Sequence, residues 1–578
     1  QEPQSSLNPV LSVGEQIAET LRKQGLHGAS RERRVAELLD AVGIPDPRRR
    51  AQEYPHQLSG GMKQRVMIAI ALAGEPELLI ADEPTTALDV TIQSQVLALL
   101  RDLQRRTGMA LLLITHDLGV VAEMADRVAV MYAGHVVEEA PAAAFFAEPA
   151  HPYSRKLFAS LPNLGKRDAR LAVIPGSVPS LAHELKACRF EARCDHAWPA
   201  CRETPPRWLE HEPGRHVRCH LYDPAQAGEP LSGHSTGDAA AASAGTNPSL
   251  ALEALLRVED LEIHFPIHTG LFKRVVGYVR AVDGVSLAIP AGRTLALVGE
   301  SGCGKTTVGK GILQLLRPTA GAVEYAGEDL TRLGGRALRR RRKELQIIFQ
   351  DPYSSMNPRM MIGDILEEGM LAQRIGRTRQ ARLQHVAALL TQVGLDADVL
   401  QRYPHEFSGG QRQRICIARA LAVDPKLVIC DEPTSALDVS VQAQILNLLQ
   451  DLQQRLGLSY LFITHNIAVV EYLAHEIAVM YLGRIVERGT VAEVLHAPRH
   501  PYTRALLSAV PTVDPQSKRE IIRLGGDLPS PANPPRGCHF HPRCPQAMPQ
   551  CRERYPGTTR FSASHSACCF LYGNGADA

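Results

Sequence analysis

The chain has 578 residues, 44% of them hydrophobic, and a formal net charge of +3. This length predicts roughly three to five domain-sized units, and the nearly balanced charge gives no indication of nucleic acid binding. No apolar run approaches the ~18 residues of a membrane-spanning helix, which argues against an integral membrane protein.

The chain contains two copies of one pattern. The stretch LSGGMKQR at 58–65 recurs as FSGGQRQR at 407–414, and LLIADEPTTALD at 78–89 recurs as LVICDEPTSALD at 427–438, each time at an offset of 349 residues. An offset that stays constant over roughly 150 residues indicates a duplicated domain rather than chance similarity.

The first copy starts inside this pattern. Gln1 corresponds to Gln350, and the second copy begins near Leu252, so residues 252–349 have no counterpart. We expect about a hundred residues to be missing from the front, as in a fragment or a misplaced gene start. The alternative is a genuinely shortened half. Without the strands of that segment, the first copy is expected to fold poorly.

Polar residues follow the apolar runs of the first copy. The run LLIA at 78–81 predicts a strand that ends at Asp82 and Glu83, and ALLLIT at 110–115 precedes His116. Such short apolar runs are typical of strands. The second copy repeats the order with Asp431 and Glu432 after LVIC, and with His465 after YLFIT.

A serine and two glycines precede a helical pattern in both copies. This arrangement predicts a helix N-terminus with exposed N–H groups, which suits an anion such as a phosphate. The residues are Ser59, Gly60 and Gly61 in the first copy and Ser408, Gly409 and Gly410 in the second.

Residues 223–249 separate the two copies. They are rich in Ala, Gly, Ser and Pro and have almost no large apolar side chain. This composition predicts a flexible tether with an average reach of roughly 30 Å.

The second copy contains a phosphate-binding loop. The stretch LALVGESGCGKTT at 295–307 is an apolar strand, then GxxxxGKT, then a helical pattern. Backbone N–H groups of such a loop cradle phosphates, Lys305 can reach the β- and γ-phosphates, and the Thr306 hydroxyl can bind Mg²⁺. The other predicted loop residues are Gly299, Glu300, Ser301, Gly302, Cys303, Gly304 and Thr307.

Two carboxylates fit the same chemistry. Asp431 would hold Mg²⁺ through its water shell, and Glu432 would polarise the attacking water. His465 follows a predicted strand. Because His116 occupies the corresponding position of the first copy, we expect this histidine to have a function.

The SGGQRQR and DEPTSALD stretches, with the isolated Gln350 and His465, resemble the ATP-binding subunits of ABC transporters. The resemblance covers nearly the whole chain. It implies an α/β fold with tandem P-loop ATPase domains paired head to tail, with ATP and Mg²⁺ as ligands. Each nucleotide would lie between the P-loop of one copy and the Ser-Gly-Gly signature of the other.

The resemblance implies one complete site and one incomplete site. The complete site would use Lys305, Thr306, Gln350, Asp431, Glu432, Asp438 and His465 with Ser59, Gly60 and Gly61; its Mg²⁺ ligands would be Thr306, Gln350 and Asp431. The incomplete site would have Gln1, Asp82, Glu83 and His116 with Ser408, Gly409 and Gly410.

The first signature departs from the second at two positions. Met62 and Lys63 stand where the second has Gln411 and Arg412, but the serine and glycines are kept. Tyr278 is a candidate for stacking on adenine.

The segments after Gln1 and Gln350, and HPYTRALLSAVP at 500–511, indicate partners. In the family, the segment after this glutamine meets a coupling helix of a membrane subunit. The tail resembles that of oligopeptide and dipeptide importer ATPases. It implies two transmembrane permease subunits, a substrate-binding protein and a peripheral location on the cytoplasmic face of the inner membrane.

Four cysteines recur with identical spacing in the two tails. They are Cys188, Cys194, Cys201 and Cys219, and Cys538, Cys544, Cys551 and Cys569. The gaps are wider than those of a zinc ribbon and differ from common ferredoxin spacings. Some importer ATPases of this group hold a four-iron, four-sulfur cluster here; zinc and ordinary thiols are the alternatives. Cys568 leaves the fourth ligand of the second group open.

We therefore predict an ATP-hydrolysing subunit of an ABC importer for peptides or related small solutes. The alternatives are a soluble tandem ATPase acting on ribosomes or DNA, and a decayed copy without activity. The predicted domains are a partial ATPase domain at 1–145, an extension at 146–222, a linker at 223–250, a complete ATPase domain at 251–495 and a second extension at 496–578.

Overall fold

A computed structural model describes residues 3–86, 88–162, 170–179, 181–182, 185–226, 254–270, 272–435, 437–511, 520–526 and 528–573. The chain forms two compact units. The first unit is Gln1–Val128 with Ala509–Arg523, and the second is Ala129–Ser508 with Leu524–Ala578.

The first unit is mainly helical. Its core is built from apolar faces such as that of α2, where Val13, Ile17 and Leu21 are buried and a Ser12–Glu15 capping box fixes the helix start. Its helices are α1 (Pro3–Ser6), α2 (Val13–Lys23), α3 (Gly28–Ala41), α4 (Pro47–Arg50), α5 (Gly60–Leu72), α6 (Val90–Thr107) and α7 (Leu118–Met124).

The two strands that pair within the first unit are buried on one face only. The strands β1 (Leu78–Asp82) and β2 (Ala110–Ile114) are parallel. Ile80 and Leu112 on the outer face are 58% and 50% exposed, whereas Leu79 on the other face is 8% exposed. Within the described residues, the outer face of this sheet is therefore an apolar surface open to solvent.

The main sheet of the second unit has eight strands in the order β12-β13-β14-β9-β15-β16-β18-β17. The first five strands run parallel, and their apolar runs are buried on both faces, as expected for a sheet covered on both sides. The strands are β9 (Thr294–Val298), β12 (Leu345–Ile348), β13 (Leu427–Asp431), β14 (Ser459–Ile463), β15 (Glu476–Tyr481), β16 (Arg484–Thr490), β17 (Thr559–Arg560) and β18 (Ser566–Ala567).

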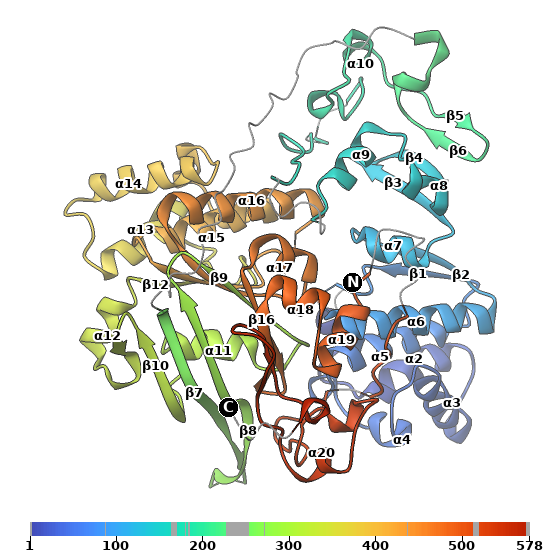
Figure 1. Cartoon of the computed structure of the whole chain (residues 1–578). Helices are drawn as coiled ribbons and strands as arrows, with labels where there is room; N and C mark the ends of the chain where they lie inside the picture. The colour runs from blue at the N-terminus through green and yellow to red at the C-terminus, as the bar shows by residue number, and fades with distance from the viewer. Residues whose placement is uncertain are drawn as a thin grey trace. The chain divides into compact units, whose positions relative to one another are not determined.

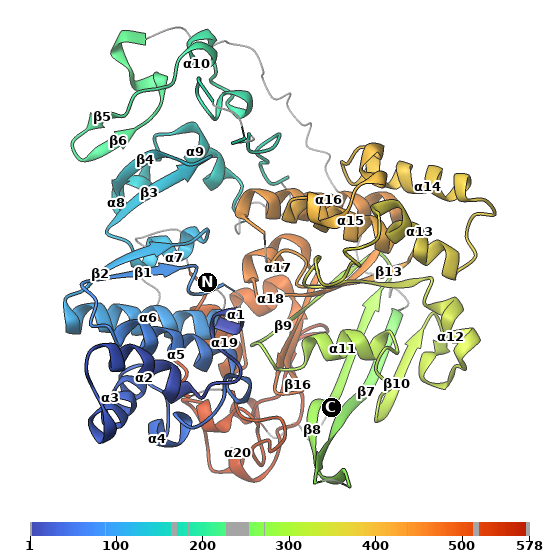
Figure 2. The same ribbon diagram turned by 180° about the vertical axis from the view of Figure 1, so that it is seen from behind.

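A second, antiparallel sheet covers one side of the phosphate-loop helix. Its order is β11-β10-β7-β8, and α11 (Lys305–Ile312) packs between it and the parallel strands, as Figures 1 and 2 show. Gly309 and Gly311 of α11 allow this close approach, because an added Cβ would meet Ile429 at 3.1 Å and Ile263 at 2.5 Å. The strands are β7 (Ala254–Thr269), β8 (Arg274–Pro290), β10 (Ala320–Tyr325) and β11 (Glu328–Asp329).

Helices form the other layer of the second unit. In both views α15 and α16 run side by side over the parallel strands (Figures 1 and 2), and they share one hydrophobic core with α13 and α14. These helices are α13 (Ile362–Ala372), α14 (Arg379–Gln392), α15 (Gly409–Leu421), α16 (Val439–Leu456) and α17 (Ile467–Leu473), and the helix α12 (Gly335–Arg341) lies outside this layer, beside β10.

Each copy continues into a small extension. The first adds β6 and β5 to β4 in the sheet β3-β4-β6-β5, and the second adds β18 and β17 to the edge of the main sheet. The remaining elements are β3 (Arg127–Tyr132), β4 (His135–Pro141), α8 (Ala142–Ala147), α9 (Pro152–Ala159), α10 (Pro199–Glu203), β5 (Leu209–Glu212), β6 (Arg215–Val217), α18 (Val491–His496), α19 (Pro501–Ser508) and α20 (Gln550–Glu553).

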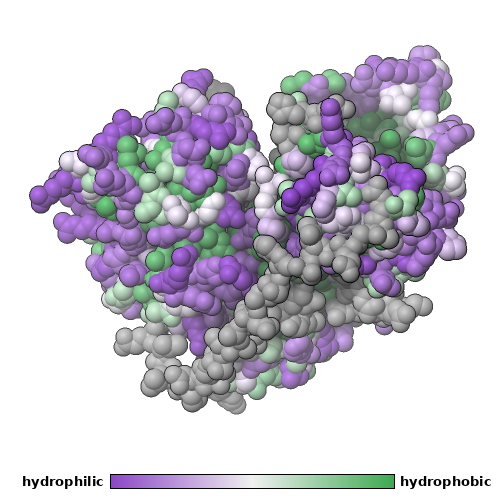
Figure 3. Space-filling model, turned by 90° about the horizontal axis from the view of Figure 1, so that it is seen from above, coloured by the Kyte–Doolittle hydropathy of each residue, from purple (hydrophilic) through white to green (hydrophobic). Residues whose placement is uncertain are grey.

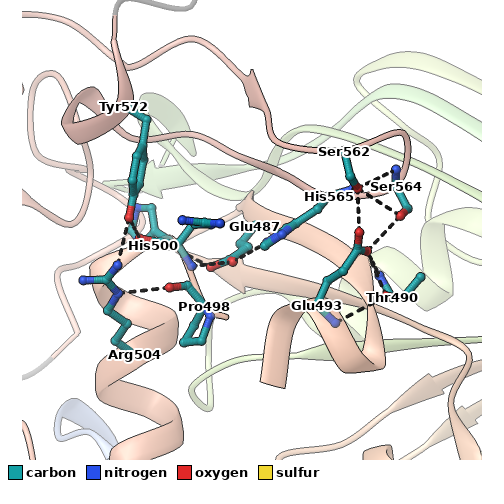
Figure 4. A network of polar contacts seen from close by, with 11 residues as sticks. Glu487, Thr490, Glu493, Pro498, His500, Arg504, Ser562, Ser564, His565 and Tyr572 are labelled. Carbon is teal, nitrogen blue, oxygen red and sulfur yellow. Dashed lines mark hydrogen bonds and ion pairs between the residues drawn. The ribbon is translucent and has the colours of Figure 1, made fainter. Parts of the chain in front are cut away.

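A buried carboxylate joins the second extension to the main sheet. Glu487 on β16 is 1% exposed and accepts hydrogen bonds from the backbone of Arg499 and His500 and from the His565 side chain, at 2.7, 2.8 and 2.8 Å (Figure 4). In the first copy, Glu138 accepts the corresponding bonds from Ala150 and His151. Each extension is thus tied to its strand by a fully bonded carboxylate.

A segment of the first extension packs against the helices of the second copy. Both belong to the second unit. Leu171 is 2% exposed and belongs to the core that contains α15 and α16. The buried Asn447 side chain on α16 accepts from the Leu171 N–H at 3.3 Å and donates to its carbonyl at 2.9 Å. This segment therefore contributes to the core of the second copy.

Candidate functional site

The predicted phosphate loop connects the end of β9 to the start of α11. Its first and last glycines have positive φ angles, +154° at Gly299 and +108° at Gly304. A Cβ at these positions would lie 2.2 Å from the Met480 carbonyl oxygen and 2.1 Å from that of Ala281. Only glycine fits both positions, because the backbone angle and the close approach each exclude a side chain.

The loop curls around the ammonium group of Lys305. Lys305 Nζ donates to the carbonyl oxygens of Gly299 and Glu300 at 2.8 and 3.0 Å. The first N–H groups of α11 have no partner within the helix and point toward the loop. A positive side chain beside a helix N-terminus forms an anion-binding site.

The side chains predicted to bind Mg²⁺ are adjacent. Thr306 Oγ1 donates to Asp431 Oδ1 at 3.0 Å, which joins the start of α11 to the end of β13. Burial raises the pKa of Asp431 above its usual value, although the hydrogen bond from Thr306 opposes this shift. A hydroxyl and a buried carboxylate are hard oxygen ligands of the kind that Mg²⁺ prefers.

Contacts with three residues hold Glu432 in place. Its φ angle is +46°, and its N–H donates to the Ile463 carbonyl oxygen at 2.9 Å, so the chain turns sharply after β13. One carboxylate oxygen accepts from Gln350 Nε2 at 2.9 Å, and the other lies 3.3 Å from His465 Nδ1. A non-glycine residue in this strained conformation is a sign of a functional position.

The surroundings of Glu432 favour its ionised form. Burial alone would raise the pKa of this carboxylate, but the hydrogen bond and charge of His465, with Lys305 and Gln350, lower it below its usual value. A carboxylate that stays ionised at neutral pH, next to a phosphate loop, can accept a proton from water.

The two signature helices begin as predicted from the sequence. Ser59 caps α5 by accepting from Met62 N–H at 3.3 Å, and Ser408 caps α15 by accepting from Gln411 N–H at 3.4 Å. Gln411 also accepts from the Ser408 N–H at 3.1 Å, which completes a capping box. Met62 cannot accept a hydrogen bond in this way, so the first copy lacks that half of the box. The glycines after each serine form the first turns of these helices, and Asp438 caps α16 by accepting from the Val441 N–H at 2.9 Å.

The first copy repeats the geometry of the strand-end residues. Asp82 ends β1, Glu83 has a φ angle of +44°, and its carboxylate lies 3.1 Å from His116 Nδ1. Thr86 Oγ1 donates to the same carboxylate at 2.8 Å. Gln1, the predicted fourth member of this group, lies outside the described residues.

Tyr278 borders a cavity in the second unit. This cavity has a volume of about 600 Å³ and lies between β8 and the second extension. Its charged lining includes Arg280, Arg484 and Arg536, and Tyr278 is 52% exposed. No residue of the phosphate loop lines this cavity, so stacking of Tyr278 on adenine stays a prediction.

The four predicted cysteines of each group line one small cavity. In the second group this set includes Cys569, whereas Cys568 lies beside Thr558, so the structure favours Cys569 as the fourth member. Burial raises the pKa of Cys538 to about 12 and that of Cys219 to about 12. In the described parts of the chain, no three His, Cys, Asp or Glu side chains are placed to share a single metal ion.

Sequence reasoning missed one contact of the phosphate loop. Glu300, the second residue of the loop, pairs with Arg543 of the second extension at 2.6 and 3.0 Å, and its N–H donates to Tyr502 Oη at 2.9 Å. The only signal in the sequence was the recurrence of an arginine, Arg193 and Arg543, just before the second cysteine of each group.

The fold and this site define a P-loop ATPase: a glycine-rich loop before a helix, a strand-end aspartate bonded to the loop threonine, and a carboxylate held by a glutamine and a histidine. Two family models match the chain. "ABC transporter" matches residues 1–86 and 282–435, and "Oligopeptide/dipeptide transporter, C-terminal region" matches 137–201 and 486–551.

The curated relatives extend this assignment over most of the chain. It is 46% identical to the glutathione import ATP-binding protein GsiA of Pectobacterium atrosepticum, over 92% of this chain and 77% of that protein. It is also 46% identical to the oligopeptide transport ATP-binding protein OppD of Mycobacterium tuberculosis, over 89% and 84%. The chain belongs to the ABC transporter family of ATP-binding proteins, and the predicted tandem P-loop ATPase fold is confirmed.

Solved structures include a more distant match. CbiO1 from Clostridium perfringens, part of the ABC transporter complex cbiONQ, is 25% identical over 42% of this chain and 91% of that chain, with a TM-score of 0.36.

Among the helices of the described residues, none is both long enough and apolar enough to cross a membrane. The face of the molecule in Figure 3 is mainly hydrophilic where it is coloured, with smaller hydrophobic areas between the polar ones.

Proposed function

We propose that this chain hydrolyses ATP to power an ABC importer of peptides or related small solutes. The single observation that carries the ATPase chemistry is the position of Glu432 between Gln350 and His465, next to a loop that holds Lys305. Importer function is supported by the relatives, which are named for glutathione import and oligopeptide transport. None of these names supports the alternative of a ribosome- or DNA-directed ATPase.

The site residues have separate proposed roles. Lys305 and the N-terminus of α11 would bind the β- and γ-phosphates, and Thr306, Gln350 and Asp431 would hold Mg²⁺. Glu432 would accept a proton from the attacking water, while His465 and Gln350 keep its carboxylate in place. Mg²⁺ would neutralise the charge that develops on the phosphates.

Replacing the proposed base tests this mechanism. Glu432→Gln keeps the side-chain volume and one acceptor oxygen but cannot take a proton. We expect the variant to bind ATP normally and to lose at least about 100-fold in hydrolysis rate. The measurement is single-turnover release of phosphate by the full chain with its membrane partners. Near-normal hydrolysis would exclude Glu432 as the base.

A matched variant in the first copy serves as the control. Glu83→Gln alters the corresponding carboxylate, which also bonds a histidine but has no phosphate loop among the described residues. We expect it to change the rate much less than Glu432→Gln does. An equal loss from both variants would mean that both carboxylates act in hydrolysis.

We propose that each group of four cysteines holds a four-iron, four-sulfur cluster. The proposal is supported by one observation: all four thiols of each group line one small cavity. Such clusters are bound by four thiolates and supply structural support or electron transfer. Zinc and ordinary thiols remain the alternatives.

Metal analysis of protein purified without oxygen tests this proposal. We expect about eight iron and eight acid-labile sulfide atoms per chain, and about half as many in Cys201→Ser or in Cys551→Ser. One zinc per group, or no metal in protein that still folds, would exclude the cluster.

We also propose that the chain works with two permease subunits and a substrate-binding protein, and that it is peripheral on the cytoplasmic face of the inner membrane. The importer relatives support both statements. The division into ATPase domains, extensions and a linker is proposed with the boundaries given above.

A further inference from the structure

A buried charge lies inside the phosphate loop itself. Glu300 is 2% exposed, and its carbonyl accepts one of the two hydrogen bonds that Lys305 donates to the loop. A carboxylate in this position would repel a bound triphosphate, and the repulsion is strong where water is excluded. The loop therefore needs a positive partner for Glu300.

That partner comes from the second extension. Arg543 Nη1 and Nη2 donate to the two oxygens of Glu300 at 2.6 and 3.0 Å, and both side chains are 3% exposed. A two-point bond between a guanidinium and a carboxylate fixes the direction of both groups. Arg543 thus neutralises Glu300 and also determines where its side chain lies.

A rigid aromatic group holds this pair in position. Tyr481, Tyr502 and Phe540 pack with ring centroids 4.7 to 5.5 Å apart. Tyr502 Oη accepts from the Glu300 N–H at 2.9 Å, so the extension contacts both the backbone and the side chain of this loop residue.

Among the described residues, the first copy has the same aromatic support around an arginine that bonds other acceptors. Tyr132, Tyr153 and Phe190 form an equivalent group with centroid distances of 4.7 to 5.5 Å. There Arg193 donates to Tyr132 Oη at 3.1 Å and to the Pro175 carbonyl oxygen at 2.7 Å. The chain therefore contains an internal control for the arginine.

We propose that Arg543 is a positioning residue for ATP binding: by pairing with Glu300, it makes the second extension part of the phosphate site. The thiol cavity is the neighbouring part of the same extension, since Cys544 follows Arg543 directly. The pair links the extension to the loop.

The test compares the two members of the pair. ATP affinity of the full chain is measured by displacement of a fluorescent ATP analogue in the presence of Mg²⁺. We expect Arg543→Met to weaken ATP binding at least about tenfold, because it removes the positive guanidinium that faces both oxygens of the buried Glu300 carboxylate. Glu300→Gln should stay within about twofold of wild type, because it adds no negative charge. The double variant should recover most of the affinity that Arg543→Met loses.

This asymmetry separates positioning from mere structural support. A structural role predicts equal losses for Arg543→Met and Glu300→Gln, since each breaks the same pair; equal losses would overturn the proposal. So would an unchanged affinity in Arg543→Met. The control Arg193→Met should bind ATP as the wild type does. Failure of the wild-type chain to bind ATP would instead count against ATP binding itself.

A milder variant covers the case in which Arg543→Met does not fold. Arg543→Lys keeps the charge but loses the two-point geometry. We expect it to weaken ATP binding about threefold at an unchanged thermal midpoint. Wild-type affinity in a folded Arg543→Lys would overturn the positional part of the proposal.

Discussion

Glu493 shows how a single side chain fixes one element to another. It is the third residue of α18, and its carboxylate accepts from Thr490 at the helix start and from Ser562 and Ser564 of the second extension (Figure 4). Burial alone would raise the pKa of Glu493, but these hydrogen bonds outweigh it and lower the pKa to about 2. In the first copy, α8 starts after Pro141 without a side-chain cap.

The pH dependence of stability follows from this lowered pKa. The unfolded chain binds a proton at Glu493 near pH 4.5, whereas the folded chain does so near pH 2. The contribution of Glu493 is therefore complete above about pH 4.5 and is lost as the pH falls toward 2. We expect Glu493→Ala to lower the free energy of unfolding by about 1 kcal/mol at pH 7 and by much less near pH 2.5.

Thermal denaturation of both proteins at the two pH values measures this effect. Ser564→Ala, which removes one of the donors, should show a smaller loss of the same sign. If Glu493→Ala lowered the midpoint equally at pH 7 and near pH 2.5, the ionised carboxylate would not be the stabilising form.

The residues next to the phosphate loop were predictable because the motif and the topology agree. The carboxyl ends of parallel strands meet at one edge of a sheet, so Asp431, Glu432 and His465 lie near the loop that follows β9. Their functional roles stay predictions until the variants are measured. Arg543 was not predictable in this way, because its partner Glu300 is 243 residues away and the pairing depends on how a whole extension packs.

At the scale of elements, strand β1 of the first copy and its counterpart β13 of the second copy differ in how far their neighbours bury them. Ile80 on β1 is 58% exposed, whereas the corresponding Ile429 on β13 is fully buried beneath α11. The sequences of the two strands are almost equally apolar, so sequence alone could not separate them. Burial of a strand depends on its neighbours, and among the described residues of the first unit none covers this face.

This difference predicts opposite effects of one substitution. We expect Ile80→Lys to change the free energy of unfolding by less than about 0.5 kcal/mol, as for other surface positions. Ile429→Lys should cost more than about 4 kcal/mol, because it buries an unpaired charge. Soluble yield and the thermal midpoint of the full chain measure both. If Ile80→Lys were as damaging as Ile429→Lys, the outer face of β1 and β2 would be covered in solution.

The repeated helices also differ in detail. The capping box of α15 needs Gln411, and the Met62 of α5 removes the returning hydrogen bond while the Ser59 cap remains. The sequence showed this substitution, and the structure gives its physical effect. A helix start with one of the two bonds keeps its N–H groups oriented but is less firmly held.

At the scale of the whole molecule, the duplication predicted the fold class but not the division into units. The repeat and the linker suggested two consecutive copies, yet the first unit includes Ala509–Arg523, and the second includes the first extension. The bonds between Leu171 and Asn447 give the reason for the second unit: a segment of one copy completes the core of the other. The sequence repeat and its motifs do not indicate that a segment of one copy packs into the core of the other.

The pair of Glu300 and Arg543 has a consequence for synthesis of the chain. A ribosome completes the phosphate loop long before it reaches Arg543, 243 residues later. During that interval Arg543 is not yet present beside Glu300, so the proposal predicts that a nascent chain binds ATP more weakly. Nucleotide would then be retained only after the last extension has folded, so ATP would bind finished molecules and leave interrupted translation products empty.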